Sequence, residues 1–156
     1  MKWIKPKYTR SQVDKAGEIL TREVVSSSER ENALTTLSNW RSSHSFPMNT
    51  FKIRLNEFSR KIDKNAIVVQ RLKRVPSIIK KLKRKQTETM KLSRMQDIGG
   101  CRSILSDIRM VMELTNLYKK SRGLKHKRVN EKDYIQNPNP DGYRGIHLIY
   151  RYNSDK

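Results

Sequence analysis

The 156-residue sequence contains a single cysteine and no apolar run that approaches the ~20 residues of a membrane-spanning helix. One cysteine, Cys101, excludes an intrachain disulfide framework and a multi-cysteine metal site. The first residues, MKWIKPK, lack the apolar stretch of a secretory signal, and no internal repeat interrupts the chain. We therefore expect a cytoplasmic, domain-sized protein that has a core of its own and does not contact a membrane.

Acidic residues are also scarce, since 15 Asp and Glu stand against 35 Lys and Arg and the net charge is +20. Such a charge attracts polyanions. Residues 71–85 hold eight basic side chains and no acid, and residues 119–128 add Lys119, Lys120, Arg122, Lys125, Lys127 and Arg128. A solvated face explains such runs as well as a bound anion does. Nucleotide phosphates would need only a few of these charges, and the surplus keeps an RNA partner open.

Residues 1–64 carry no motif with an assignable chemistry, and their apolar residues recur at helical spacing. Thr9 or Ser11 can cap a first helix, and a second is expected at about residues 28–42. A third, amphipathic helix is expected to start at Pro47. We predict that this N-terminal helical segment is scaffold.

Residues 65–156 change to strands separated by helices, which predicts an α/β or α+β domain. The expected elements are a strand at 66–73, a helix from Pro76, a strand at 101–105 after a break at Gly99-Gly100, a helix from Asp107 to Gly123, a loop at 137–142 and a strand at 143–152.

Three short motifs in this region carry side chains suited to phosphates and a metal. They are Arg71-Leu-Lys73 with Ser77-Ile78 and Lys81, then Asp97-x-x-Gly100-x-Arg102, then Lys132-Asp133-Tyr134-Ile135 with Gly142-Tyr143-Arg144-Gly145-Ile146-His147. Arg71 and Lys73 are two residues apart, so their side chains share one face of the expected strand. Burying two positive charges there would cost free energy unless the strand is an exposed edge or an anion binds to them.

Each remaining motif residue has a plainer interpretation beside the functional one. Ser77 and Lys81 at a helix start form a generic anion site. Asp97 can hold Mg²⁺ near a triphosphate or can cap a turn. His147 on an alternating strand can be a phosphate contact or a hydrogen-bonded rim residue, and Tyr143 offers a flat surface for a base.

The order and spacing of these motifs over about residues 65–152 resembles the synthetase domain of the RelA/SpoT family. That family transfers pyrophosphate from ATP to the 3′-hydroxyl of a guanine nucleotide, so the resemblance implies the synthesis of guanosine tetra- or pentaphosphate. It also implies a nucleotidyltransferase-like mixed sheet with flanking helices.

The resemblance assigns a role to each candidate residue. It implies that Arg71 and Arg102 sandwich adenine, that Lys73, Ser77 and Lys81 contact the triphosphate, that Asp97 holds Mg²⁺, and that Lys132, Tyr143 and His147 hold the acceptor. Asp97 and Lys81 are thus the expected catalytic residues. Asp141 replaces a frequent Asn of relatives and can still accept from guanine, while Arg144-Gly145 replaces Gln-Ser and adds positive charge.

Two other functions stay open. The chain also resembles the toxic small alarmone synthetases, some of which modify the 3′ end of tRNA and would need an antitoxin, and the +20 charge and Arg144 favour this alternative. The other is a non-catalytic nucleotide-binding fragment. The family continues into a Glu-x-Gln-hydrophobic-Arg strand with a second catalytic carboxylate, and this sequence ends at Lys156. We therefore expect residues 1–156 to be catalytically incomplete, since neither Glu131 nor Asp133 is a convincing substitute.

Overall fold

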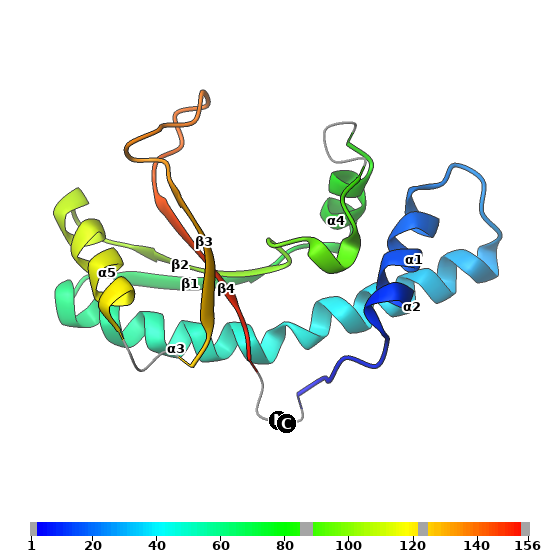
Figure 1. The fold of residues 1–156 in the computed structure, drawn as a ribbon, viewed down its shortest axis with the longest axis horizontal. Coiled ribbons are helices and arrows are strands. Elements are labelled where there is room, and N and C mark those ends of the chain that lie inside the picture. Colours follow the sequence, from blue (N-terminus) through cyan, green and yellow to red (C-terminus); the bar gives the residue numbers. More distant parts are fainter. Residues whose placement is uncertain (1–2, 85–88, 122–124, 154–156) are drawn as a thin grey trace. The chain divides into compact units, whose positions relative to one another are not determined.

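The computed structural model describes residues 3–84, 89–121 and 125–153, and Figure 1 shows its helices and strands. Lys85 and Arg122 of the two basic runs, and Gly123, which was expected to end a helix, lie outside these residues. The chain divides into two compact units, unit 1 with Met1–Ile53 and Val69–Arg102 and unit 2 with Arg54–Val68 and Ser103–Lys156. These units are defined by contacts and interleave in sequence, so the domain boundary at residue 64 stays a prediction.

The expected N-terminal helices are present. Helix α1 (Arg10–Thr21) is capped by Thr9, whose hydroxyl accepts the backbone N–H of Gln12 at 3.3 Å. Helix α2 (Ser27–Ser43) is capped in the same way by Ser26. Helix α3 (Ser45–Ile62) begins two residues before Pro47, which fits a proline in the first helical turn.

Strands β1 (Ile67–Leu72) and β2 (Gly99–Ile104) form one two-stranded sheet, and part of each strand belongs to unit 1. Unit 1 also contains helix α4 (Val75–Leu82) and the short helix η2 (Leu92–Arg94). The predicted break at Gly99-Gly100 is wrong, because both glycines belong to β2. A Cβ on Gly99 would meet Leu72 and His44 at ordinary contact distances of 3.5 and 3.6 Å, so the strand does not require a glycine at this position.

The core of unit 1 joins α1, α2 and α4 to the segment around η2. Its fully buried side chains include Val13, Leu20, Leu37, Ile78, Leu92 and Ile98. Gly17 of α1 makes this contact close, because a Cβ there would lie 2.9 Å from Cβ of Leu92. Ile98 directly follows Asp97, so the core holds the segment that carries this candidate site residue.

Unit 2 contains α5 (Ile108–Lys120), capped as predicted by Asp107, and a second sheet formed by β3 (Lys127–Asp133) and β4 (Ile146–Arg151). Its core joins Phe58 of α3 and Leu114 and Tyr118 of α5 to Leu148 and Tyr150 of β4. The predicted third strand is confirmed, although it begins three residues after Tyr143. Strand β3 was not predicted, because KRVNEKD has no apolar alternation.

The antiparallel register of β3 and β4 assigns each side chain to a face. Lys132 pairs with His147 on one face, and Glu131 pairs with Leu148 on the other. A register shift between Arg128 and Asn130 places Arg128 opposite Tyr150, on the face of Leu148 that packs against α5. The helices and small sheets confirm the predicted α/β class, and no described helix is long and apolar enough to cross a membrane.

Candidate functional site

The candidate residues of unit 1 form what we call the Asp97 cluster: Arg71, Lys73, Ser77, Lys81, Asp97 and Arg102. Lys73 Nζ donates to Asp97 Oδ2 at 2.9 Å, and Lys81 Nζ donates to Asp97 Oδ1 at 2.8 Å. Lys73 directly follows β1 and Lys81 belongs to α4, and they meet a carboxylate that lies just before β2. The fold therefore brings two of the three sequence motifs to one point.

Asp97 is ionised at neutral pH in this setting. Partial burial alone would raise the pKa of its carboxyl, but the hydrogen bonds and charges of Lys81 and Lys73 outweigh that effect and hold the pKa below its ordinary value. The side chain of Asp97 is 46% exposed, whereas those of Lys73 and Lys81 are 21% and 24% exposed. The cluster thus presents an accessible carboxylate between two sheltered cations.

The backbone on either side of these residues is also fixed. Lys73 lies just beyond the last residue of β1, and its N–H donates to the carbonyl of Ile98 at 2.8 Å. Its own carbonyl accepts from Nε of Arg41 at 2.7 Å. Arg41 belongs to α2, and sequence reasoning missed it because it lies outside the three motifs.

The other members of the cluster lie on the same elements. Ser77 is in the first turn of α4 and Lys81 is one turn further along, as predicted. Arg71 on β1 and Arg102 on β2 are both exposed and belong to one two-stranded sheet. The roles of these four residues in binding remain predictions.

The candidate residues of unit 2 lie at one end of the β3–β4 pair: Lys132, Asp141, Tyr143 and His147. Together with Tyr134, which was not a candidate, they form what we call the hairpin cluster. The Tyr143 hydroxyl and Nε2 of His147 are hydrogen-bonded at 2.8 Å. The ring of Tyr134 lies edge-on to both, with centroids 5.7 Å from Tyr143 and 5.1 Å from His147. Tyr134 packs on both predicted ligand contacts, and its place in the Lys-Asp-Tyr-Ile motif was the only sequence signal for it.

The loop before β4 sets the position of Tyr143. Asp141 Oδ1 accepts the backbone N–H of Tyr143 at 3.0 Å, and Gly142 follows with φ of 79°, a conformation that favours glycine. A Cβ on Gly145 would lie 3.1 Å from the Tyr143 hydroxyl. A side chain at position 145 would therefore crowd the hydroxyl that binds His147.

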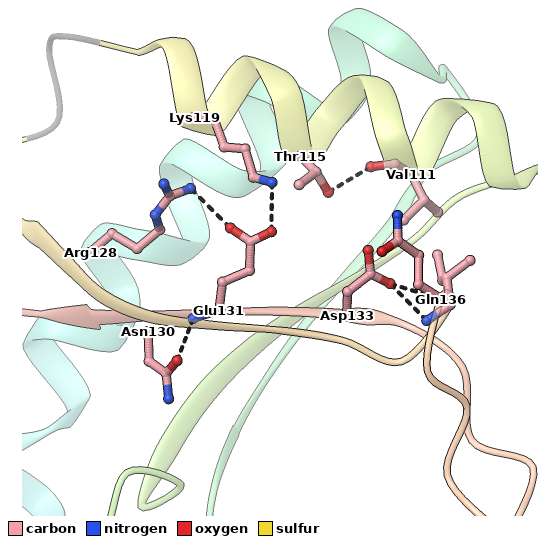
Figure 2. A network of polar contacts seen from close by, with 9 residues as sticks. Val111, Thr115, Lys119, Arg128, Asn130, Glu131, Asp133 and Gln136 are labelled. Atoms are coloured by element: carbon pink, nitrogen blue, oxygen red, sulfur yellow. Dashed lines mark hydrogen bonds and ion pairs between the residues drawn. The ribbon is translucent and has the colours of Figure 1, made fainter.

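Two carboxylates of β3 are engaged elsewhere. Figure 2 shows Glu131 between Lys119 of α5 and Arg128, whose Nη1 lies 3.3 Å from Glu131 Oε2. Asp133 Oδ1 accepts the backbone N–H groups of Ile135 at 2.9 Å and Gln136 at 3.0 Å. Glu131 is thus held in ion pairs, while Asp133 caps the turn that follows β3 through one oxygen, and the expectation that neither supplies the second catalytic carboxylate stays a prediction. These contacts also show that Lys119 and Arg128 of the basic run are partly neutralised.

The donor set of the Asp97 cluster fits Mg²⁺ shared with a phosphate ligand. The described residues contain no group of three or more His, Cys, Asp and Glu side chains that could hold a metal by themselves. Mg²⁺ commonly takes one or two protein carboxylates and completes its shell with phosphate oxygens and water. Asp97, ionised and half exposed, can be such a ligand.

Comparison with known proteins identifies one family. Residues 70–156 match the family described as a region found in RelA / SpoT proteins. GTP pyrophosphokinase YwaC of Bacillus subtilis is 42% identical over 83 residues, a stretch that covers 51% of this chain and 38% of YwaC. GTP pyrophosphokinase YjbM of the same organism is 34% identical over 88 residues, covering 54% of this chain and 39% of YjbM. The match thus spans about two fifths of each curated relative.

Solved structures show the same fold. A GTP pyrophosphokinase family protein from Streptococcus pneumoniae has a TM-score of 0.55 at 24% identity, covering 70% of this chain and 57% of that protein. Small alarmone synthetase 1 from Bacillus subtilis, bound to its product pppGpp, has a TM-score of 0.59 at 23% identity, covering 69% of this chain and 57% of the synthetase. At these identities the likeness concerns the fold alone, and it agrees with the expected fold class.

Proposed function

Because the chain belongs to the RelA/SpoT family, we propose that it acts as an ATP-dependent pyrophosphokinase. The reaction would transfer the β,γ-pyrophosphate of ATP to the 3′-hydroxyl of GDP or GTP and release AMP. The observation that carries the proposal is the convergence of Lys73 and Lys81 on Asp97 within the matched region. The two curated relatives are both named GTP pyrophosphokinases, which supports the reaction class.

In this proposal ATP binds to the Asp97 cluster. Lys73 and Lys81 exchange the oxygens of Asp97 for phosphate oxygens, to which ammonium groups bind as compact point charges. Ser77, in the first turn of α4, donates its hydroxyl to a phosphate near the helix N-terminus. The guanidinium groups of Arg71 and Arg102 stack on the adenine ring.

Asp97 then has a separate task, because its carboxylate is released from the lysines when phosphate replaces it. It would hold Mg²⁺ together with donor phosphates, and the ion would supply positive charge that offsets the charge developing in a phosphoryl-type transfer. The chain's own lysines add to this stabilisation. The ion pairs with Asp97 hold both ammonium groups close to the carboxylate that would bind Mg²⁺.

The acceptor binds to the hairpin cluster. Tyr143 stacks on guanine, while Lys132 and His147, paired across the sheet, contact acceptor phosphates. The free oxygen of Asp141 accepts from the guanine edge, because its Oδ1 is engaged with the backbone. The 3′-hydroxyl attacks the β-phosphorus, the bond from that phosphorus to the α-phosphate bridging oxygen breaks, and the hydroxyl proton passes to a base. Neither Glu131, which is held by Lys119 and Arg128, nor Asp133, whose Oδ1 caps the following turn, is proposed as that base.

A second acceptor, the 3′ end of tRNA, is favoured by one observation. Lys127 and Arg151 pair with each other on the same face of the β3–β4 sheet as Lys132 and His147. Both side chains are exposed. A basic strip that leads away from the hairpin cluster could follow a nucleic-acid backbone.

The experiment is a transfer assay with ATP labelled in the γ-phosphate, run on residues 1–156 extended through the family's Glu-x-Gln-hydrophobic-Arg strand. GDP, GTP and deacylated tRNA are offered separately, and the products are resolved together with AMP. We expect label in the guanine nucleotide, equimolar AMP, and loss of both in Asp97→Asn. Label in tRNA alone would support the second acceptor, and no label in any acceptor would reject the proposed activity.

A further inference from the structure

Lys73 is held through its backbone on both sides. Its N–H donates to the carbonyl of Ile98, the residue after Asp97, at 2.8 Å. Its carbonyl accepts from Arg41 Nε at 2.7 Å. A lysine side chain has four flexible bonds, so the place of its ammonium group depends first on where its backbone is fixed. The first contact comes from the segment that carries Asp97, the ion-pair partner of Lys73. The second contact comes from α2.

The contact from α2 is the one that the family match does not contain. Arg41 lies 29 residues before the matched region begins at residue 70, in the segment whose helices we predicted to be scaffold. Helix α2 packs into the core of unit 1 through Ala33, Leu37 and Trp40, and the Trp40 carbonyl closes its last turn by contacting Ser43 Oγ and His44 Nδ1, each at 2.7 Å. Arg41 therefore projects from a packed helix.

We propose that Arg41 is a positioning residue of the ATP site. It acts by positioning Lys73, so helix α2 contributes to ATP binding. The inference rests on the proposed function. The group that matters is the Nε–H of Arg41. It donates to the Lys73 carbonyl and so holds the β1–α4 junction at a set distance from Asp97. The positive charge of Arg41 is not what the role requires.

This distinction can be tested with two variants of similar size. The amide nitrogen of glutamine stands at the same number of bonds from Cα as Nε of arginine, so Arg41→Gln keeps a donor for the Lys73 carbonyl without the charge. Arg41→Met keeps the length and removes the donor. Arg30→Met, an exposed arginine on the same helix, is the matched control.

The measurement is calorimetric titration of ATP with Mg²⁺ into each variant, after circular dichroism and thermal melting have shown that it is folded. We expect Arg41→Met to bind ATP about tenfold more weakly, which corresponds to the upper end of the usual contribution of a single hydrogen bond. Arg41→Gln should stay within about threefold of wild type, and Arg30→Met should match it. In a Lys73→Met background, Arg41→Met should have a clearly smaller further effect, because the ammonium group that it helps to place is gone while the backbone carbonyl that it contacts remains.

Three results would overturn the inference while leaving the ATP site intact. They are wild-type affinity in Arg41→Met, equal losses in Arg41→Gln and Arg41→Met, and a full additional loss in the Lys73→Met background. The second and third would mean that the charge of Arg41 acts on the ligand directly. If wild type itself bound no ATP, the proposed ATP site would be wrong and this inference with it.

Discussion

Removing the two cations at the far end of the β3–β4 sheet should separate the two candidate acceptors. The change is Lys127→Gln with Arg151→Gln, which pair on the face of Lys132 and His147. At ~3.3 Å per strand residue they lie ~13–16 Å along the sheet from those two residues. That separation exceeds the Debye length of ~8–10 Å at physiological salt. The affinity of a nucleotide bound at the hairpin cluster should therefore hardly change.

The expected magnitudes differ for the two ligands. The affinity for GDP should stay within about twofold of wild type, because no phosphate of a bound nucleotide reaches the substituted positions. If tRNA contacts both cations, removing each contact should reduce the magnitude of the slope of log affinity against log salt concentration by ~0.7–0.9. Two lost contacts would lower the slope by ~1.4–1.8, so that a fourfold rise in salt would change the affinity about tenfold less than in wild type.

The assay is calorimetry for GDP and filter binding for deacylated tRNA, each between low and moderate salt. Arg109→Gln with Lys120→Gln removes the same charges from exposed positions on α5 and is the matched control. A loss of GDP affinity in the sheet variant, but not in the control, would refute the placement of the acceptor at the hairpin cluster.

Other consequences concern stability and the adenine contact. Gly17→Ala should lower the free energy of unfolding in urea, because its Cβ would lie 2.9 Å from Cβ of Leu92, and overpacking of ~1–3 kcal/mol exceeds the ~1 kcal/mol gain in helix propensity. Burial lowers the pKa of His44 more than its hydrogen bond to the Trp40 carbonyl raises it, so the unfolded chain binds the proton more readily. The melting temperature should therefore fall as pH decreases below about 6.5, and by less in His44→Gln. Arg102→Ala should weaken ATP binding by about 1–2 kcal/mol in calorimetry, and unchanged affinity would remove it from the adenine site.

Local signals predicted the helices well because caps act within a few residues. Thr9 and Asp107 each accept a backbone N–H three residues ahead, a contact that the sequence alone defines. The same reasoning failed for β3 and for Gly99-Gly100. Strand β3 is stabilised by its pairing with β4, and β2, which contains both glycines, pairs with β1, so neither result could be read from local composition.

The candidate site shows the same limit. Motif order identified Lys73, Lys81 and Asp97, but their meeting depends on contacts 16 and 24 residues apart that no spacing rule supplies. The charge of the 119–128 run was visible in the sequence. Its partial neutralisation by Glu131 was not, because the register of β3 and its packing on α5 decide which face each side chain occupies.

The ATP site is tested most directly by asking whether Lys81 contributes to ATP binding and the adjacent Lys80 does not. Lys80 and Lys81 are adjacent on α4, but only Lys81 donates to Asp97 and is sheltered, whereas Lys80 is exposed. ATP with Mg²⁺ is titrated into the wild-type chain, Lys81→Met and Lys80→Met. Lys81→Met should lose about 1.5–3 kcal/mol of binding free energy, as expected for a hydrogen bond to a charged group, and Lys80→Met should match wild type. Equal affinities in the two variants would contradict an ATP site built on the Asp97 cluster.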